Sequence, residues 1–231
     1  MLGIIAAMQK EMDMIAAAMT DPVTEKVGAV TFVKGTLAGY PVVCSVCGIG
    51  KVFAAICTEA MILKYSPELI VNTGVGGTLT KSLSIGDVAV STKVCQHDMD
   101  TTAIGDEPGL ISGINRVYFP ADGEAVSAIC EIAKKLAIKT HCGTIASGDK
   151  FIASAEEKER ITTLFGAVCC EMEGGSVGHV CFVNNVPFAV IRAISDDADG
   201  GAVEDYPAFA AASAEKSARI VISLAERLAS K

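Results

Sequence analysis

Clusters of basic residues are scarce in this 231-residue sequence. Lys and Arg total 19 against 27 Asp and Glu, which gives a formal net charge of −8. Binding to a nucleic-acid backbone requires grouped Lys and Arg side chains, and the sequence contains no such group. We therefore expect a small-molecule ligand and no nucleic-acid partner.

Long apolar runs and a targeting segment are also lacking. No apolar stretch approaches the roughly 20 residues that a membrane-spanning helix needs. The first residues carry no basic region of the signal-peptide kind, and Lys10, Glu11 and Asp13 interrupt the apolar segment that follows. These features predict a soluble, cytoplasmic protein without a membrane partner.

The nine cysteines and three histidines show no metal-ligand spacing. The cysteines are odd in number, scattered and mostly set in apolar runs, which is typical of buried free thiols. Cys44 and Cys47 have the spacing of a redox motif, but they lie in an apolar segment that is typical of a strand. Residues three apart on a strand point to opposite faces, so we predict no redox site, no metal and no cofactor.

No linker, repeat or low-complexity tract divides the chain. At 51% hydrophobic, the sequence supplies enough apolar side chains for a core, and we expect residues 1–231 to form one domain. One segment, Asp98 to Pro120, lacks clear periodicity. Apolar side chains spread along it indicate that it covers a pocket or packs on another subunit.

Short β-branched runs alternate with segments of helical periodicity. Strands are expected at Leu2–Ala7, Val30–Leu37, Pro41–Cys47, Glu68–Thr73, Gly86–Cys95, Lys139–Ser147, Ala167–Cys170 and Val186–Ile194. Helices are expected from Met8 to Met19, Gly48 to Lys64, Asp122 to Leu136, Ser154 to Phe165 and Tyr206 to Ala229. The alternation predicts a three-layer α/β/α sandwich, and an early antiparallel hairpin makes its mostly parallel central sheet mixed.

Three carboxylates lie at or just past the ends of predicted strands: Glu11, Glu173 and Asp196. In open α/β sheets the ligand crevice lies outside the carboxyl ends of the strands, so we expect these acids at one cleft. Cleavage of an N-glycosidic bond needs such a set, because one acid protonates the leaving base while another activates water. Spacing alone does not assign the roles, and for Glu11 stabilisation of a helix N-terminus is the structural alternative.

Several motifs occur in an order and spacing that resemble one family. They are G-I-I-A-A-M-Q-K-E-M from Gly3, G-I-G-K from Gly48, N-T-G-V-G-G from Asn72, G-D-V-A-V-S from Gly86, H-D-M-D from His97, S-G-D-K-F-I from Ser147, E-M-E from Glu171 and V-I-R-A-I-S-D ending at Asp196. Together they resemble the nucleoside phosphorylase/nucleosidase superfamily, and within it the bacterial 5′-methylthioadenosine/S-adenosylhomocysteine nucleosidases. The resemblance covers nearly the whole chain and implies the same fold.

The resemblance also implies roles for individual residues. Asp196 would protonate N7 of adenine, Glu11 would activate water, and Glu173 would bind the ribose hydroxyls. The implied substrate-binding set is Met8, Ile49, Val75, Phe151, Ile152, Met172, Glu173, Arg192, Ser195 and Tyr206. The implied reaction is hydrolysis of methylthioadenosine, S-adenosylhomocysteine and related nucleosides by a homodimer whose loop from Met99 to Ile114 lies near the partner's site. A structural ion pair is the alternative for Arg192, and ordinary core packing is the alternative for Met8 and Met172.

Two positions depart from the family pattern. Relatives usually carry Ser at the position of Val75 and Phe at that of Tyr206. Valine cannot donate a hydrogen bond, so we expect Asp196 to be oriented by the Ser195 hydroxyl, by backbone N–H groups or by an ordered water. The Tyr206 hydroxyl affects the expected preference for the 5′-substituent.

Other functions are weighed by the residues that they would require. A purine nucleoside phosphorylase needs several cations around phosphate, yet Lys51 is the only cation in Gly48–Lys51 and none lies in Asn72–Gly77, so hydrolysis is favoured. An aminofutalosine hydrolase remains an alternative on the same fold. A non-catalytic nucleoside-binding module has no use for a second and third carboxylate. A nicotinamide-binding protein would carry G-x-G-x-x-G on the first turn, which this chain lacks.

Overall fold

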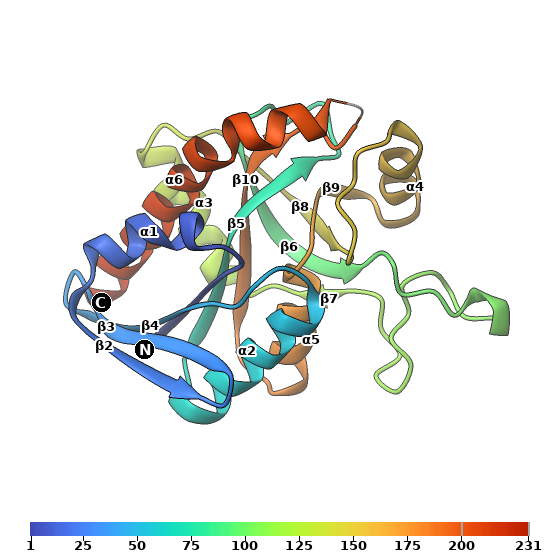
Figure 1. The fold of residues 1–231 in the computed structure, drawn as a ribbon. Helices are drawn as coiled ribbons and strands as arrows, with labels where there is room; N and C mark the ends of the chain where they lie inside the picture. The colour runs from blue at the N-terminus through green and yellow to red at the C-terminus, as the bar shows by residue number, and fades with distance from the viewer. Residues whose placement is uncertain (200, 231) are drawn as a thin grey trace.

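A computed structural model describes residues 1–199 and 201–230, and its strands join in one mixed sheet with helices on both faces (Figure 1). The strands are β1 Leu2–Ala6, β2 Thr20–Val27, β3 Val30–Leu37, β4 Tyr40–Val46, β5 Leu69–Thr78, β6 Val88–Gln96, β7 Phe119–Pro120, β8 Thr140–Ser147, β9 Ala167–Glu171 and β10 Phe188–Asp196. The helices are α1 Gln9–Ala18, α2 Lys51–Tyr65, α3 Gly123–Lys135, α4 Ala155–Phe165, α5 Gly174–Val183 and α6 Ala202–Ala229, with a 3-10 turn at Thr102–Ile104.

The sheet is centred on β5. This strand pairs in parallel with β1 and β10, and its far end pairs antiparallel with β9. Further pairings join β10 to β6, β6 to β8 and β8 to β9, so this part of the sheet returns to β5 and closes on itself. The hairpin strands β2 and β3 extend the other side through β4 and are antiparallel. Strand β1 therefore pairs in parallel with β4 and β5, and β5 pairs in parallel with β10. Antiparallel pairs join β2 to β3, β3 to β4, β10 to β6 and β5 to β9.

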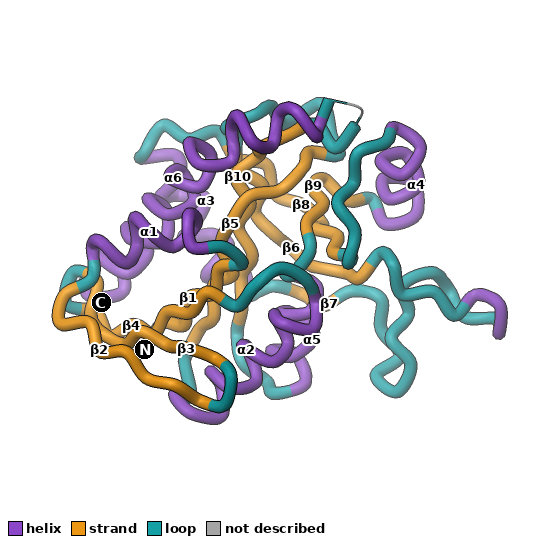
Figure 2. The backbone as a smooth tube through the Cα atoms, viewed as in Figure 1, coloured by secondary structure: helices purple, strands orange, loops and turns teal. Residues whose placement is uncertain are grey.

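Two apolar layers flank the sheet and confirm the predicted three-layer arrangement. Helices α1, α3 and α6 bury Ile15, Ile129 and Val221 in one core cluster. Helices α2 and α5 bury Met61 and Val177 in the cluster on the opposite face. Helix α4 packs separately beside β8 and β9, as Figure 2 shows.

Several elements differ from the predicted ones. Strand β2 was not predicted, because its residues are polar and mostly exposed and it pairs only with β3 at the sheet edge. Strand β5 was expected to end before Gly74, yet it continues to Thr78. Helix α5 was not predicted, and α6 begins at Ala202 rather than Tyr206. The two-residue strand β7 was also not predicted, because it lies in the segment from Asp98 to Pro120 that lacks periodicity. The remaining strands and helices match the predicted ranges to within a few residues, as expected for boundaries assigned from periodicity.

The glycines of β5 explain why this strand does not stop where a glycine run suggests a turn. A Cβ on Gly74 would lie 2.6 Å from Glu11 Oε1, and a Cβ on Gly77 would lie 2.6 Å from Asp196 Oδ1. Glycine is therefore required at both positions by close approach to a carboxylate and not by backbone conformation. Because the two glycines have no side chains, both acids can lie close to the same strand.

Within the described ranges, 1–199 and 201–230, none of the helices combines the length and apolarity needed to cross a bilayer.

Candidate active site

A cavity of about 370 Å³ opens where the carboxyl ends of β1, β5, β9 and β10 meet. Its walls contain Ala7, Met8, Glu11, Ile49, Val75, Gly76, Gly77, Lys150, Phe151, Ile152, Cys170, Glu171, Met172, Glu173, Ser195, Asp196, Val203 and Tyr206. Every residue of the predicted site lies in this wall except Arg192. The ends of β9 and β10 are not paired with each other, because β5 lies between them and pairs with both.

Glu11 lies in the first turn of α1 and is buried. Its carboxylate accepts hydrogen bonds from the backbone N–H groups of Ala7 at 3.0 Å, Met8 at 2.9 Å and Val75 at 3.0 Å. Burial raises the pKa of Glu11, while the charge of Arg192 and the three N–H groups act in the opposite direction. The side chain stabilises the start of its own helix, as the structural alternative expected, and it also lines the cavity.

Asp196 ends β10 and is also buried. The Ser195 hydroxyl donates to Oδ2 at 2.8 Å, and the backbone N–H of Ala198 donates to Oδ1 at 2.9 Å. Burial is the main cause of its raised pKa, which the two hydrogen bonds oppose. Two of the three expected partners of this acid, the Ser195 hydroxyl and a backbone N–H, therefore form hydrogen bonds with it.

The Val75 side chain packs against Ala210 and Ala214 of α6. We expect Val75→Ser to change kcat/KM by less than about twofold, because Asp196 already accepts two hydrogen bonds. The measurement is the initial rate of adenine release from methylthioadenosine. A gain near fivefold, the value of about 1 kcal/mol for one hydrogen bond, would show that Asp196 is under-supported.

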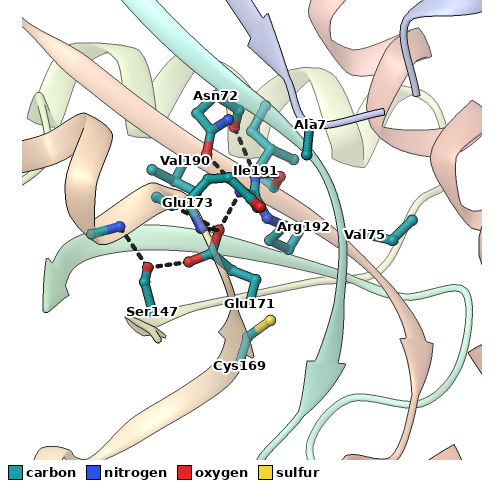
Figure 3. A network of polar contacts seen from close by, with 12 residues as sticks. Ala7, Asn72, Val75, Ser147, Cys169, Glu171, Glu173, Val190, Ile191 and Arg192 are labelled. Carbon is teal, nitrogen blue, oxygen red and sulfur yellow. Dashed lines mark hydrogen bonds and ion pairs between the residues drawn. The ribbon is translucent and has the colours of Figure 1, made fainter. Parts of the chain in front are cut away.

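Arg192 lies beneath the cavity and is only 1% exposed. Its guanidinium forms an ion pair with Glu171, lies 3.6 Å from a Glu173 oxygen and donates to the backbone oxygen of Asn72 at 3.2 Å (Figure 3). A second donor reaches the Asn72 side chain. Arg192 therefore neutralises and positions two glutamates and does not line the cavity. This arrangement matches the structural ion pair that was the alternative for Arg192 in the sequence analysis.

Glu171 was missed as a site residue. Its carboxylate pairs with Arg192, accepts from the Ser147 hydroxyl, and accepts from the backbone N–H groups of Glu173 at 3.1 Å and Gly174 at 2.8 Å (Figure 3). These bonds fix the turn from β9 into α5. The available signal in the sequence was that Glu171 directly follows the predicted strand Ala167–Cys170, whereas its contact with Arg192 is visible only in the structure.

Glu173 projects from this turn toward the cavity. The backbone N–H of Gly50, at the start of α2, donates to its Oε1 at 2.9 Å. Burial, followed by the negative charge of Glu171, raises the pKa of Glu173 to about 7. A carboxyl group with such a pKa gains or loses its proton near neutral pH, and it is suited to hydrogen bonding with hydroxyl groups.

An apolar wall faces these acids. The Phe151 and Tyr206 rings meet edge to face with centroids 5.6 Å apart. The Tyr206 hydroxyl lies 3.1 Å from Met8 Sδ and accepts from Lys10 Nζ at 3.1 Å, so both hydroxyl contacts are with protein groups. Ile49 and Phe151 remain partly exposed at the rim.

A polar cluster ties the loops beside the cavity together. Lys51 forms an ion pair with Asp98 at 2.6 Å, and its backbone N–H donates to Asp149 at 2.8 Å. Asp98 also accepts from the Asp149 N–H at 2.9 Å. Lys150, a cation of the cavity wall, contacts Glu157 at 2.6 Å, so it is ion-paired as Lys51 is. In residues 1–199 and 201–230, no three or more His, Cys, Asp and Glu side chains are grouped to hold a metal ion.

Comparison with known proteins agrees with this geometry. A family model described as "Phosphorylase superfamily" matches residues 1–226. The chain belongs to this superfamily. Within it, the 5'-methylthioadenosine/S-adenosylhomocysteine nucleosidase of Shewanella oneidensis is 38% identical over 228 residues, which cover 98% of this chain and 97% of that protein.

Solved structures of the superfamily superpose closely on the chain. A 5'-methylthioadenosine/S-adenosylhomocysteine nucleosidase from Neisseria meningitidis, in complex with methylthio-immucillin-A, gives a TM-score of 0.94 at 32% identity and covers 100% of this chain and 99% of its own. A futalosine hydrolase of Helicobacter pylori also gives 0.94, at 33% identity, and covers 98% of this chain and 97% of its own.

Proposed function

We propose that this member of the phosphorylase superfamily is a nucleosidase. It hydrolyses the N-glycosidic bond of 5′-methylthioadenosine, S-adenosylhomocysteine and related 5′-substituted adenosines. The observation that carries the proposal is that Glu11, Glu173 and Asp196, three buried carboxylates from separate segments, line one cavity. Relatives of that name at 38% identity over nearly the whole chain support it.

In the proposed reaction Asp196 is the general acid. Ser195 and the Ala198 N–H hold its carboxyl group, and burial raises its pKa so that it keeps a proton closer to neutrality. That proton passes to N7 of adenine as the bond between C1′ and N9 breaks. Protonation prevents full negative charge from building on the leaving base.

Glu11 is the proposed base. Water attacks C1′ and gives a proton to Glu11, so that the products are adenine and the 5′-substituted ribose. The hydrogen bonds from Ala7, Met8 and Val75 hold the carboxylate in place. Glu173 accepts hydrogen bonds from the ribose hydroxyls, and the apolar wall of Met8, Phe151 and Tyr206 receives the 5′-substituent.

The cations beside the cavity favour hydrolysis over phosphorolysis. Lys51 and Lys150 each contact a carboxylate, and Lys10 contacts the Tyr206 hydroxyl, so these cations do not form the group of several free cations that a multiply charged phosphate needs. Adenine release from methylthioadenosine is therefore expected to proceed at the same rate, within about twofold, with or without phosphate and with or without a chelator. A strict phosphate requirement, or loss of turnover on chelation, would contradict the proposal.

The preferred nucleoside among close analogues is tested by the same assay. The similarity to a futalosine hydrolase equals that to the nucleosidases in TM-score, so aminofutalosine is the second candidate substrate. Specificity constants on methylthioadenosine, S-adenosylhomocysteine, 5′-deoxyadenosine and aminofutalosine rank them directly. A specificity constant for aminofutalosine far above the others would assign the chain to that reaction.

We further propose that two copies form a homodimer through α2. Its apolar side chains Val52 and Phe53 are 68% and 59% exposed, Ile56 and Leu63 on the same helix are also exposed, and so is Ile49 just before it. Such a contiguous apolar stripe on a surface helix is typical of an interface. The loop from Met99 to Ile114 projects away from the sheet (Figure 2), with Ile104 exposed, and we expect it to lie near the cavity of the partner subunit.

Val52→Asp is expected to convert the dimer to a monomer, because it places a charge in the apolar contact. Sedimentation velocity at micromolar concentration measures the change. Leu164→Asp is the matched control, since Leu164 is an exposed apolar residue on α4, away from α2. A wild-type protein that sediments as a monomer would refute the proposed interface.

A further inference from the structure

Two cysteine side chains meet outside the cavity. Cys130 of α3 and Cys142 of β8 have their sulfur atoms 3.1 Å apart. Cys142 is exposed and Cys130 is half-buried, whereas Cys44, Cys57 and most of the other thiols are buried. The expectation of buried free thiols thus fails for this pair.

The fold explains why these two residues meet. A short turn joins α3 to β8, and the helix packs against the strand. Side chains alternate along a strand, so Thr140 and Cys142 share one face, and both interact with Cys130. Pairing of β8 with β9 begins only at Thr144, which leaves Cys142 at an open sheet edge and accessible to solvent.

We propose that Cys130 and Cys142 form a redox-active dithiol that closes into a disulfide bridging α3 and β8. Two thiols in contact, one of them open to solvent, meet the geometric requirement for thiol–disulfide exchange. The oxidant is a small disulfide of the glutathione class. The pair is separate from the proposed reaction at the cavity.

The exchange has two balanced steps. The Cys142 thiolate attacks one sulfur of the oxidant, forms a mixed disulfide and releases one thiolate. Cys130 then loses its proton to solvent and attacks Cys142 Sγ, which forms the protein disulfide and releases the second thiolate. The protein loses two hydrogen atoms, and one small disulfide becomes two small thiols.

The order of attack follows from the surroundings of each thiol. Burial, and then the contact with Cys142, raise the pKa of Cys130 to about 12, so it forms little thiolate while Cys142 is unmodified. Cys142 is the exposed partner and is reached first by an oxidant. Cys130 acts as the resolving thiol because it is already at contact distance.

The bridge is expected to stabilise the fold and leave the cavity unchanged. It closes a loop between positions twelve apart, which restricts the unfolded chain. Cys142 lies near the start of β8, whereas the contact of this strand with the site is made by Ser147 at its other end. We expect a rise in Tm of roughly 5 to 10 °C on oxidation.

The test uses the whole protein and oxidised glutathione as the probe. Non-reducing peptide mass mapping should find a Cys130–Cys142 cross-link that dithiothreitol removes, together with the rise in Tm. Cys130→Ser should instead keep glutathione on Cys142, because the resolving thiol is gone. Cys142→Ser should form neither product. Cys47→Ser, which removes a half-buried thiol elsewhere, is the matched control and should still form the cross-link.

Three results would overturn the proposal. The wild-type protein could retain glutathione on Cys142 without a cross-link, or both thiols could remain open to alkylation after oxidation. A cross-link that forms only under denaturing conditions, or that lowers Tm, would show that the fold does not accommodate the bond. The mass readout does not depend on activity, so it stands whatever the substrate proves to be.

Discussion

Asp196→Asn is expected to lower kcat for methylthioadenosine at least ~10²-fold, the usual loss when a general acid is removed. Asparagine has nearly the same shape, and its Oδ1 can still accept from the Ala198 N–H while its Nδ2 donates to the Ser195 hydroxyl, so the cavity keeps its form. It has no acidic proton to give to N7 of adenine. We therefore expect KM to change by only a few-fold while the chemical step fails.

The pH profile separates loss of the acid from a loss of folding. An acid must be protonated to act, so wild-type kcat should fall as pH rises through the pKa of Asp196, which burial raises. The residual activity of Asp196→Asn should lack this alkaline limb. Asp197→Asn is the control, because it removes the same charge one residue on and outside the cavity wall. Near-normal turnover in Asp196→Asn would exclude the assigned role.

Arg192→Met is expected to destabilise the protein by about 3–5 kcal/mol, the range observed when one partner of a buried ion pair is removed. Arg192 is the cation that faces Glu171 and Glu173, and all three side chains are buried. Methionine fills much of the same volume but leaves both carboxylates without a counter-charge. The expected fall in Tm is roughly 6 to 20 °C for a chain of this length.

The destabilisation should depend on pH. The pKa of Glu173 in the folded protein is about 7, above its value of 4.5 in the absence of burial, so the folded state favours the protonated form. The stability that this proton contributes is present below the unfolded pKa and is lost as pH rises through about 7. Since Arg192 lowers that pKa, its loss should cost more above pH 7 than below it.

A surface pair provides the control for this experiment. Arg227 contacts Glu131 at 2.6 Å, but both side chains are substantially exposed. Exposed ion pairs contribute only about 0–1 kcal/mol, so Arg227→Met should barely move a urea or thermal unfolding curve. Equal losses of stability in Arg192→Met and Arg227→Met would mean that burial does not increase the contribution of the Arg192 ion pair to the free energy of unfolding.

Local patterns were enough to predict most elements and the acids that line the cavity. Asp122 and Ser154, the first residues of two predicted helices, cap α3 and α4, and alternation of apolar runs with helices predicts the layers. Glu11, Glu173 and Asp196 were found because a strand end is visible in the sequence as the end of an apolar run. These features depend on residues that are close together in the sequence, so composition and spacing are sufficient to predict them.

Contacts between distant segments were decided by the tertiary structure. The closure of the sheet through β9 and β10 onto β5 depends on strand pairing, which periodicity does not encode. The continuation of β5 through Gly74 and Gly77 depends on acids from other elements that approach its backbone. In a sequence, glycine usually indicates a turn. Only the packed structure shows that these glycines leave room for neighbouring carboxylates.

The sequence by itself therefore determined the fold class and the acids of the candidate site, because apolar periodicity and strand ends are local properties. The tertiary structure decided that Arg192 serves the glutamates beneath the cavity, that Glu171 belongs with them, and that Cys130 meets Cys142. Each of these depends on the direction and distance of side chains from separate elements. Packing sets those directions, and sequence spacing does not contain them.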